Sequence, residues 1–317
     1  MTKRRAALLA TPLLLALGLF SLRSRATTHE AKPAALGVVR SNADLEAVVE
    51  LPGPLTVETV IGADWAVDRS GLINLDHPKA KAAGLKDGLE PIVIGFHAIQ
   101  HPTRGLFLVD TGTERALRDD REHTAFKGLV GKALHADKLI VHQDTAGWIG
   151  SRKVAGVFLT HLHLDHLTGM RDVPNDAVVY TGPGESSEVG LMPRFLRSVT
   201  DQALEGKGAL NELQFSSDGV LDVFGDGSFW ALYVPGHTKG STAFLARTAQ
   251  GPVLMTGDAC HTKWGWDNGV EPGTFSDDKK ASAESLARLR GLVARHPEIE
   301  VRLGHQGFAN TTAVTQK

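Results

Sequence analysis

The sequence predicts a single α/β domain of layered sheets, and three observations support this fold class. Short β-like runs separated by glycine recur from Thr56 almost to the C-terminus. Helical patterns lie between or after several of these runs, without any internal repeat. The 317 residues, 42% of them hydrophobic, are enough to bury a substantial core. Strands and helices mixed along the whole chain favour sheets covered by helices over an all-α or all-β fold.

The first 26 residues have the order of a secretory signal peptide. Three basic residues at positions 3–5 precede an apolar run at 6–20, and the small residues Ser24 and Ala26 offer a cleavage site. The run is shorter than the ~20 apolar residues of a usual spanning helix. We therefore expect an exported protein, either periplasmic or secreted. The alternative is an uncleaved membrane anchor over residues 6–22, because two arginines lie close to the proposed cut.

Removal of this segment leaves an acidic chain. Residues 1–26 hold five basic residues and no acidic one, so the remainder has 29 basic against 36 acidic residues, a net charge of −7. Binding to nucleic acid requires clustered Lys and Arg, so no nucleic-acid partner is expected. Cys260 is the only cysteine, which excludes an intramolecular disulfide.

The elements are expected in a definite order. Residues 27–55 are rich in Ala, Pro and Gly and are interpreted as a linker and irregular lead-in, with the main α/β domain at 56–317. A helix is predicted at 278–295, ended by a His–Pro pair. Segment 185–228 has weak strand signals and is interpreted as a helical or loop insertion over the site. The clearest strands are predicted at 91–99, 105–110, 154–160, 177–180, 229–234, 241–246 and 253–256.

The densest chemistry lies in the run HLHLDH, which directly follows the predicted strand 154–160. In an extended exit from that strand, His161 and His163 point the same way and can converge on one metal ion. Asp165 and His166 then lie at the turn into the next element and can face a second metal. Imidazole and carboxylate ligands suit zinc, although iron or manganese can replace it.

Three further ligand-type residues follow predicted strands, each beside a glycine. They are His237 in PGHT, Asp258 in TGDA and His305 in GHQ. Each motif is weak by itself, since a lone histidine or aspartate beside glycine is more often a loop residue. Together with HLHLDH, however, they provide enough ligands for two metal ions at one edge of a sheet.

This series of motifs, with LVDTG around Asp110 upstream, resembles the metallo-β-lactamase superfamily in both order and spacing. The resemblance implies a four-layer αβ/βα sandwich with two zinc ions per chain. It also implies that Asp258 bridges the metals and that Asp110 supports the metal loop from outside. The first zinc would be held by His161, His163 and His237, and the second by Asp165, His166 and His305.

Within the superfamily that the chain resembles, the true β-lactamase branches carry no carboxylate at the bridging position, whereas this chain has Asp258 there. The stretch from Leu254 onward is similar to the quorum-quenching lactonase-like branch. In those lactonases a tyrosine three residues after the bridging aspartate contacts the substrate carbonyl, whereas this chain has His261. A histidine can also donate a hydrogen bond or a proton, so His261 is a candidate catalytic residue, with a surface loop residue as the alternative.

The expected reaction is hydrolysis of an ester or lactone carbonyl of a small molecule by a metal-bound hydroxide. Asp258 would fix the metal spacing and Asp165 would accept a proton from the nucleophile. A phosphotriester or sulfate-ester hydrolase would share the same metal site, and a non-enzymatic zinc-binding module is the alternative from another class. The sequence does not indicate the oligomeric state.

Other residues are interpreted as structural or left open. Cys260 is expected to be a small buried hydrophobe rather than a ligand. Trp264 and Trp266 either line an apolar substrate pocket or pack in the core. Five histidines outside the motifs are expected to be surface or structural residues: His97, His101, His123, His135 and His142.

Overall fold

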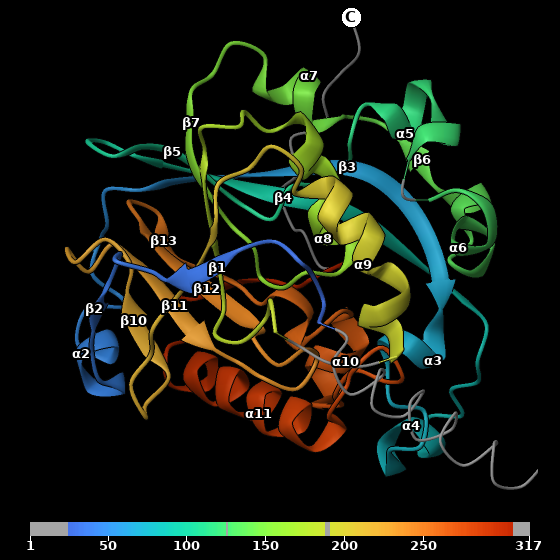
Figure 1. The fold of residues 1–317 in the computed structure, drawn as a ribbon. Helices are drawn as coiled ribbons and strands as arrows, with labels where there is room; N and C mark the ends of the chain where they lie inside the picture. The colour runs from blue at the N-terminus through green and yellow to red at the C-terminus, as the bar shows by residue number, and fades with distance from the viewer. Residues whose placement is uncertain (1–24, 125, 188–190, 307–317) are drawn as a thin grey trace, which may run out of the picture.

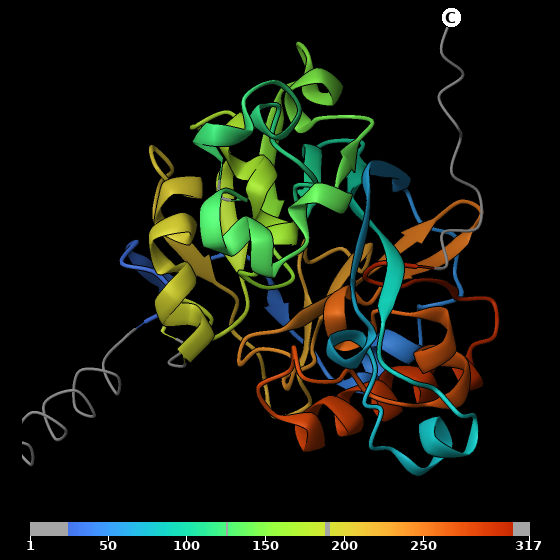
Figure 2. The same cartoon turned by 90° about the vertical axis from the view of Figure 1, so that its right-hand side faces the viewer.

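The computed structural model describes residues 25–124, 126–187 and 191–306. Two β-sheets pack face to face, and helices cover both outer faces (Figures 1 and 2). This arrangement confirms the predicted four-layer αβ/βα sandwich. Most of the expected signal peptide or anchor lies outside the described residues. Within the described ranges, no helix is both long enough and apolar enough to cross a membrane.

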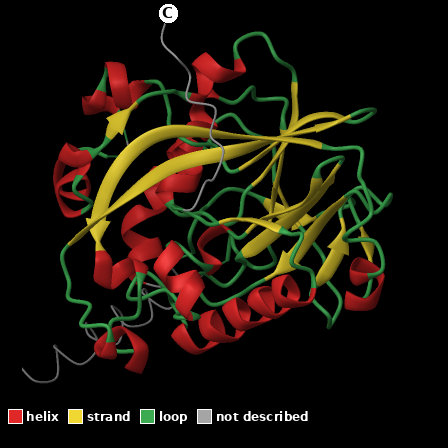
Figure 3. Cartoon of the chain, turned by 180° about the vertical axis from the view of Figure 1, so that it is seen from behind, coloured by secondary structure: helices red, strands yellow, loops and turns green. Residues whose placement is uncertain are grey.

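The first sheet has eight strands in the order β1-β9-β8-β7-β5-β4-β3-β6. Its longest members, β3 and β4, form a curved antiparallel ribbon (Figure 3). On the other side of β4, β5 pairs antiparallel with β4. The sheet then continues through β7, β8, β9 and β1, and each of these strands is parallel to the one before it. The strand bounds are β1 Ala31–Pro33, β3 Thr56–Asp68, β4 Leu89–His101, β5 Gly105–Val109, β6 Ile140–Val141, β7 Val154–Phe158, β8 Val178–Thr181 and β9 Leu210–Glu212.

The second sheet has six strands in the order β14-β13-β12-β11-β10-β2. All its pairs are antiparallel except β13 with β14, which is parallel. The bounds are β2 Val38–Val39, β10 Val220–Asp222, β11 Phe229–Tyr233, β12 Thr242–Thr248, β13 Gly251–Met255 and β14 Glu300–Arg302. The seven strands predicted from the sequence are all present, with ends within two residues of the expected positions.

Aromatic side chains fill the space between the sheets. Phe107 and Phe158 project from the first sheet and meet Phe229 and Phe244 of the second. The rings of Phe229 and Phe244 stack with centroids 5.5 Å apart. Burial of this apolar area holds the two sheets together, at roughly 25 cal/mol for each Å² removed from water.

Helices cover the outer faces through apolar stripes. Helix α11 (Lys279–Arg295) matches the predicted helix, and Leu289 and Leu292 pack it on the second sheet. Its N-cap Asp278 accepts hydrogen bonds from two backbone N–H groups, which fixes where the helix begins. The first sheet is covered by α7 Thr145–Ile149, α8 Leu164–Leu167, η3 Thr168–Asp172 and the end of α9 Leu191–Ala203.

Shorter helices connect the strands at the edges of both sheets. Their bounds are α2 Asn42–Glu46, α3 Arg69–Leu72, α4 Pro78–Ala82, α5 Ala116–Asp119, η1 Arg121–His123, α6 Gly128–Ala133, η2 Ala136–Lys138, η4 Gly257–Ala259 and α10 Lys263–Asn268.

Two segments differ from the sequence-based interpretation. Residues 27–55, expected as a linker, contain β1, β2 and α2, and these belong to the folded domain. Strand β1 pairs with β9, β2 pairs with β10, and α2 buries Leu45 against the second sheet. Segment 185–228 contains the helix α9, but it also contributes β9 and β10, so it is only partly an insertion. In both segments long-range pairing stabilises strands that local sequence signals do not indicate.

Candidate metal centre

The HLHLDH motif lies where β7 leads into α8. Strand β7 ends at Phe158, and His161 and His163 follow in an irregular segment that enters the helix. His163 is the N-cap of α8, so Asp165 and His166 lie in the first turn of the helix rather than in a turn before it. Six consecutive residues thereby place two side chains ahead of a helix and two on it.

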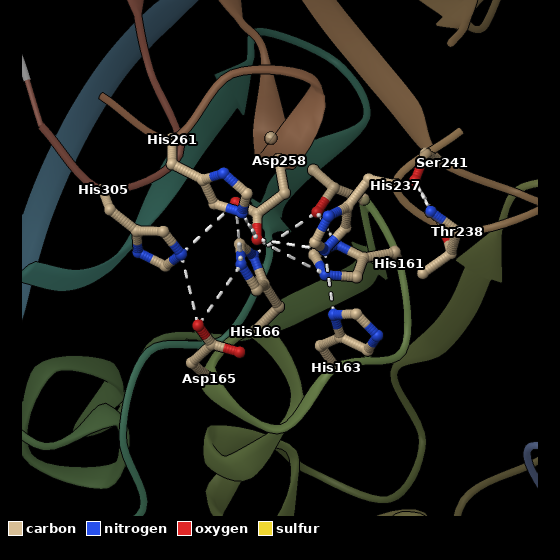
Figure 4. A network of polar contacts seen from close by, with 12 residues as sticks. His161, His163, Asp165, His166, His237, Thr238, Ser241, Asp258, His261 and His305 are labelled. Atoms are coloured by element: carbon tan, nitrogen blue, oxygen red, sulfur yellow. Dashed lines mark hydrogen bonds and ion pairs between the residues drawn. The ribbon is translucent and has the colours of Figure 1, made fainter. Parts of the chain in front are cut away.

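The other candidate ligands also follow strands. His237 lies between β11 and β12, Asp258 lies in η4 after β13, and His305 follows β14. The strand ends bring all three side chains to the HLHLDH segment at one edge of the sandwich (Figure 4). The structure therefore brings together every ligand that the sequence predicted.

These side chains form two clusters, and within each cluster the ligand atoms lie within 4.8 Å of one another. The first contains His161, His163, His237 and Asp258. The second contains Asp165, His166, Asp258 and His305. Asp258 belongs to both clusters.

The two carboxylate oxygens of Asp258 face different clusters. Oδ2 lies 3.3 Å from Nε2 of His237 and 3.7 Å from Nε2 of His161. Oδ1 lies 3.3 Å from Nε2 of both His166 and His305. This geometry is suited to a carboxylate that bridges two cations.

The chemistry of the donor set fits zinc. Among the described residues, three buried atoms of the clusters make no hydrogen bond: Nε2 of His161, Nε2 of His166 and Oδ1 of Asp258. A buried polar atom without a partner is costly unless an ion or water satisfies it. Three histidines with a shared aspartate, and two histidines with two aspartates, are ligand sets that zinc takes in proteins.

Contacts outside the clusters orient the histidine rings. Oδ2 of Asp110 lies 2.8 Å from Nδ1 of His166, which leaves Nε2 of that ring facing the second cluster. Asp110 adopts a left-handed backbone conformation (φ 59°), and its Oδ1 also accepts a hydrogen bond from the backbone N–H of Thr160. Nδ1 of His305 is likewise held by the carbonyl of Val93, at 2.9 Å. The resemblance implied this supporting position for Asp110.

The electrostatics of the two clusters differ. Burial holds the pKa of His161 and of His237 well below the usual range, which keeps both rings neutral, as ligation requires. In the second cluster, burial disfavours a charge on His305, but Asp258 and Asp165 outweigh it and raise its pKa to about 10. The carboxylates of this cluster therefore attract positive charge strongly when no metal ion is bound.

A cavity of about 130 Å³ opens onto both clusters. His163, Asp165, His237, Asp258 and His305 form its floor. Its walls are mainly apolar: Trp65, Val67, Leu72, Ile92, Leu134, Leu164, Leu196 and Phe275. The single α9 residue among them, Leu196, agrees with the expectation that part of segment 185–228 lies over the site.

His261 lies inside the centre rather than on a surface loop. Its side chain is buried, and Nε2 lies 3.0 Å from Oδ2 of Asp258. Nδ1 lies 3.1 Å from the carbonyl oxygen of Leu72, and because a carbonyl only accepts, Nδ1 carries a proton. The ring stacks on His305 and lines the cavity, although His261 belongs to neither ligand cluster.

The structure also decides the remaining candidates. Trp264 and Trp266 pack against the core, and the aromatic cavity walls come instead from Trp65 in β3 and from Phe275. Cys260 is buried against Leu286 and Leu303, and burial raises the pKa of its thiol to about 12.

The five histidines expected to be surface or structural residues lie outside both ligand clusters. His97 and His101 are buried, and each contacts a polar side chain of the fold. The exposed or half-buried members pair with aspartates: His123, His135 and His142.

Sequence reasoning did not identify the apolar cavity walls or Glu185. The walls come from six separate segments of the chain, and no motif connects them. Glu185 follows β8 and accepts hydrogen bonds from two of the loops that carry ligands. A lone glutamate after a Gly-Pro-Gly turn has no recognisable signature in the sequence.

Comparison with known proteins agrees with this geometry. The chain is 27% identical over 235 residues to the N-acyl homoserine lactonase AttM of Rhizobium johnstonii, covering 70% of this chain and 84% of that protein. It is 26% identical over 238 residues to the γ-lactamase FDB1 of Fusarium pseudograminearum, covering 67% of this chain but only 57% of that longer protein.

A solved structure has the same fold. An N-acyl homoserine lactone hydrolase, with its product N-hexanoyl-L-homoserine bound at the catalytic metal centre, superposes with a TM-score of 0.56 and 20% identity. The match covers 80% of this chain and 93% of that one. These comparisons confirm the predicted superfamily and its lactonase-like branch. Residues 97–305 match the family model for the metallo-β-lactamase superfamily, and the chain belongs to that superfamily.

Proposed function

We propose that the chain is a dinuclear zinc hydrolase that opens an ester or lactone bond in a small molecule with an apolar substituent. The observation that carries the proposal is Asp258, whose two oxygens face two separate ligand clusters beside an apolar cavity. Two zinc ions held there would supply an activated water and polarise the substrate carbonyl.

The residues of the chain would divide the work. His161, His163 and His237 would hold the first metal, and Asp165, His166 and His305 the second, with Asp258 shared. Asp165 faces the cavity, and its neighbours His166 and His305 keep its pKa below the ordinary value despite burial. It is therefore ionised and can accept a proton from the attacking water at its carboxylate.

His261 would act on the substrate side of Asp258. The carbonyl of Leu72 fixes the orientation of its ring, so Nε2 is held toward Oδ2 of Asp258 and toward the cavity. Because Nδ1 already donates to the Leu72 carbonyl, Nε2 can donate to a substrate oxygen only when it also carries a proton, in the imidazolium form. In that form His261 would take the place of the tyrosine of the resembling lactonases. The apolar walls would bind the acyl part and exclude bulk water from the reacting carbonyl.

A γ-lactam is the second candidate substrate. The relative FDB1 is a γ-lactamase, and a γ-lactam shares its five-membered ring and carbonyl with a γ-lactone. The metal centre can polarise either carbonyl, but the amide nitrogen is the poorer leaving group and needs a proton donor. We favour the lactone because AttM shares more of its length with this chain.

A substrate panel on metal-quantified protein tests the proposal. The protein is stripped with a chelator, reloaded with zinc, and assayed on an N-acyl homoserine lactone, an aryl ester, a γ-lactam and a phosphotriester. We expect about two zinc ions per chain and the highest kcat/KM on the lactone. Asp258→Ala should lose both zinc and turnover. Full zinc content together with full turnover in that variant would contradict the assignment, and a preference for the phosphotriester would replace the proposed substrate class.

A further inference from the structure

Glu185 is a buried acid outside both ligand clusters. It follows strand β8 through the turn Gly182–Gly184, and its side chain is only 1% exposed. It does not line the cavity described above. A carboxylate in such a position is costly to bury unless hydrogen-bond donors surround it.

The donors around Glu185 come from two loops. Oε1 accepts a hydrogen bond from the backbone N–H of Leu162 at 2.8 Å. Oε2 accepts one from the backbone N–H of Gly240 at 2.8 Å and another from Oγ1 of Thr238 at 2.8 Å. One carboxylate therefore joins the loop that carries His161 and His163 to the loop that carries His237.

The backbone around Glu185 is built for this contact. A Cβ on Gly182 would lie 1.7 Å from the carbonyl oxygen of Gly240, and a Cβ on Gly240 would lie 2.7 Å from the side chain of Glu185. Only glycine allows the turn and the loop to approach so closely. Thr238 is held in turn by Ser241, whose Oγ accepts from the Thr238 backbone N–H at 3.0 Å (Figure 4).

The second ligand cluster is positioned by other groups. Asp110 orients His166, and the carbonyl of Val93 orients His305. Asp165 lies on α8, beyond the Leu162 contact. The link through Glu185 thus concerns the three histidines of the first cluster.

We propose that Glu185 is a positioning residue that sets the separation of His161 and His163 from His237, and thereby the zinc affinity of the first cluster. The inference rests on the proposed function, because it assumes that this cluster binds zinc. It goes beyond that function by assigning the affinity of one metal site to a residue that contacts neither metal ligand nor substrate.

Glu185→Gln is the sharpest variant because of the donor arrangement. Each carboxylate oxygen faces one backbone N–H, so the amide group of glutamine must point its NH₂ at a donor in either orientation. The side-chain shape is kept, but one of the two loops loses its hydrogen bond. Thr238→Val is a milder variant that removes only the hydroxyl contact.

Asp222→Asn is a matched control. Its buried carboxylate accepts from the backbone N–H of Gly225 through Oδ1 and of Gly227 through Oδ2, each at 2.9 Å. The same amide conflict therefore arises, but in a turn outside both ligand clusters. Any effect of burial and lost hydrogen bonds on stability alone is shared by the two variants.

The experiment measures zinc content and zinc affinity by chelator competition, together with the melting temperature of the metal-free proteins. We expect Glu185→Gln to bind one of two zinc ions at least tenfold more weakly than the wild type, and Thr238→Val to show a smaller loss of the same sign. Asp222→Asn should keep both affinities even if its melting temperature falls. The inference would be overturned if Glu185→Gln bound both zinc ions as tightly as the wild type does. It would also be overturned if Asp222→Asn lost as much zinc affinity as Glu185→Gln.

If Glu185→Gln is insoluble, Thr238→Val provides the test, and it must then bind one zinc ion more weakly than the wild type. Failure of the proposed function is distinguishable, because the wild-type protein itself would then bind no zinc. That result would overturn the proposed function together with the inference that rests on it. If the wild type binds zinc and the variants bind it with the same affinities, only the role of Glu185 is overturned.

Discussion

Oδ2 of Asp110 lies 2.8 Å from Nδ1 of His166, and this contact leaves Nε2 of the ring directed toward Asp258. Among the described residues, the Asp110 side chain is hydrogen-bonded to Thr160 and to His166 and to no histidine of the first cluster, so its orienting effect falls mainly on the second cluster. The residue follows β5, whereas His166 lies on α8, and the hydrogen bond therefore ties the metal ligand to the sheet.

Asp110→Asn should weaken the second metal site selectively. The amide occupies the same space as the carboxylate but has only one acceptor oxygen and no charge. It therefore cannot accept from both the Thr160 backbone N–H and Nδ1 of His166. Loss of such an orienting carboxylate typically lowers metal affinity or activity by about 10–100-fold. Chelator competition should show one weakened zinc ion. Equal weakening of both would contradict the assignment of Asp110 to the second cluster.

His261→Ala should retain both zinc ions but lose turnover. His261 belongs to neither ligand cluster, yet it lines the cavity and lies 3.0 Å from Asp258. With a proton on Nε2 as well as on Nδ1, His261 would donate to the reacting carbonyl, and loss of that donor should lower kcat by about 10²–10³-fold. Metal content is measured alongside kcat in the same preparation. A loss of zinc would instead identify His261 as a ligand.

His261→Tyr provides the companion measurement. It introduces the residue that the resembling lactonases carry at this position. Partial recovery of kcat relative to His261→Ala is expected if a hydrogen-bond donor is what the site needs. No recovery would show that the imidazole acts through Asp258 rather than on the substrate.

Phe275→Ala should lower the preference for substrates with long apolar acyl groups. Phe275 forms part of the apolar cavity wall and packs beside Gly71. Loss of the ring removes apolar contact worth about 1–2 kcal/mol, so kcat/KM should fall about tenfold for a long-chain lactone and less for a short-chain one.

Trp148→Ala is the control for this effect. Trp148 packs edge-on against Phe96, with ring centroids 5.1 Å apart, and is not part of the cavity wall. The variant should lose stability without changing the ratio of kcat/KM between the two chain lengths. A shift of that ratio in Trp148→Ala as large as in Phe275→Ala would show that the cavity does not select the acyl group.

His97 is expected to make the metal-free protein less stable in acid. Burial lowers its pKa from the ordinary 6.5 to about 3, so the unfolded chain takes up a proton at a pH where the folded chain does not. The stability is complete above pH 6.5 and falls as the pH drops toward 3, by about 1.4 kcal/mol for each pH unit. His97→Gln has no such group to titrate.

Denaturant unfolding of the two metal-free proteins between pH 7 and pH 4.5 measures this contribution. The other buried histidines titrate in both proteins and cancel in the difference. As the pH falls, the unfolding free energy of the wild type should therefore decrease more than that of His97→Gln. Parallel curves would mean that His97 is protonated without cost in the folded state.

The sequence was sufficient for the parts of the fold that leave a local or a motif signal. The strands that lead to His161, His237 and Asp258 are apolar runs, and in the last two a glycine directly precedes the ligand. All three strands lie within two residues of their predicted positions. The ligand motifs were recognisable because metal coordination restricts which residues can occupy them. These two signals together place all seven predicted ligand residues at one edge of the sandwich.

Features that depend on distant segments were not predictable. Strands β1 and β2 have only three and two residues, and each is stabilised by a partner strand about 180 residues later in the chain. Trp65 of β3 lines the cavity together with Leu164 of α8, far away in the sequence, whereas Trp264 and Trp266 pack against the core. Glu185 is significant only through its hydrogen bonds to Leu162, Thr238 and Gly240, which are distant from it in the sequence.

The pairing of β1 with β9 and of β2 with β10 has a consequence for how the chain folds. Strands β1 and β2 are synthesised long before their partners at 210–222, and neither sheet completes this edge until these distant segments have paired. Such non-local contacts slow folding, because the entropy of closing a long loop is lost before the pairing is gained. Until β1 and β2 have paired, the edges of β9 and β10 stay open to pairing with other chains. Deletion of residues 27–40 should therefore increase aggregation during refolding more than it changes the metal centre.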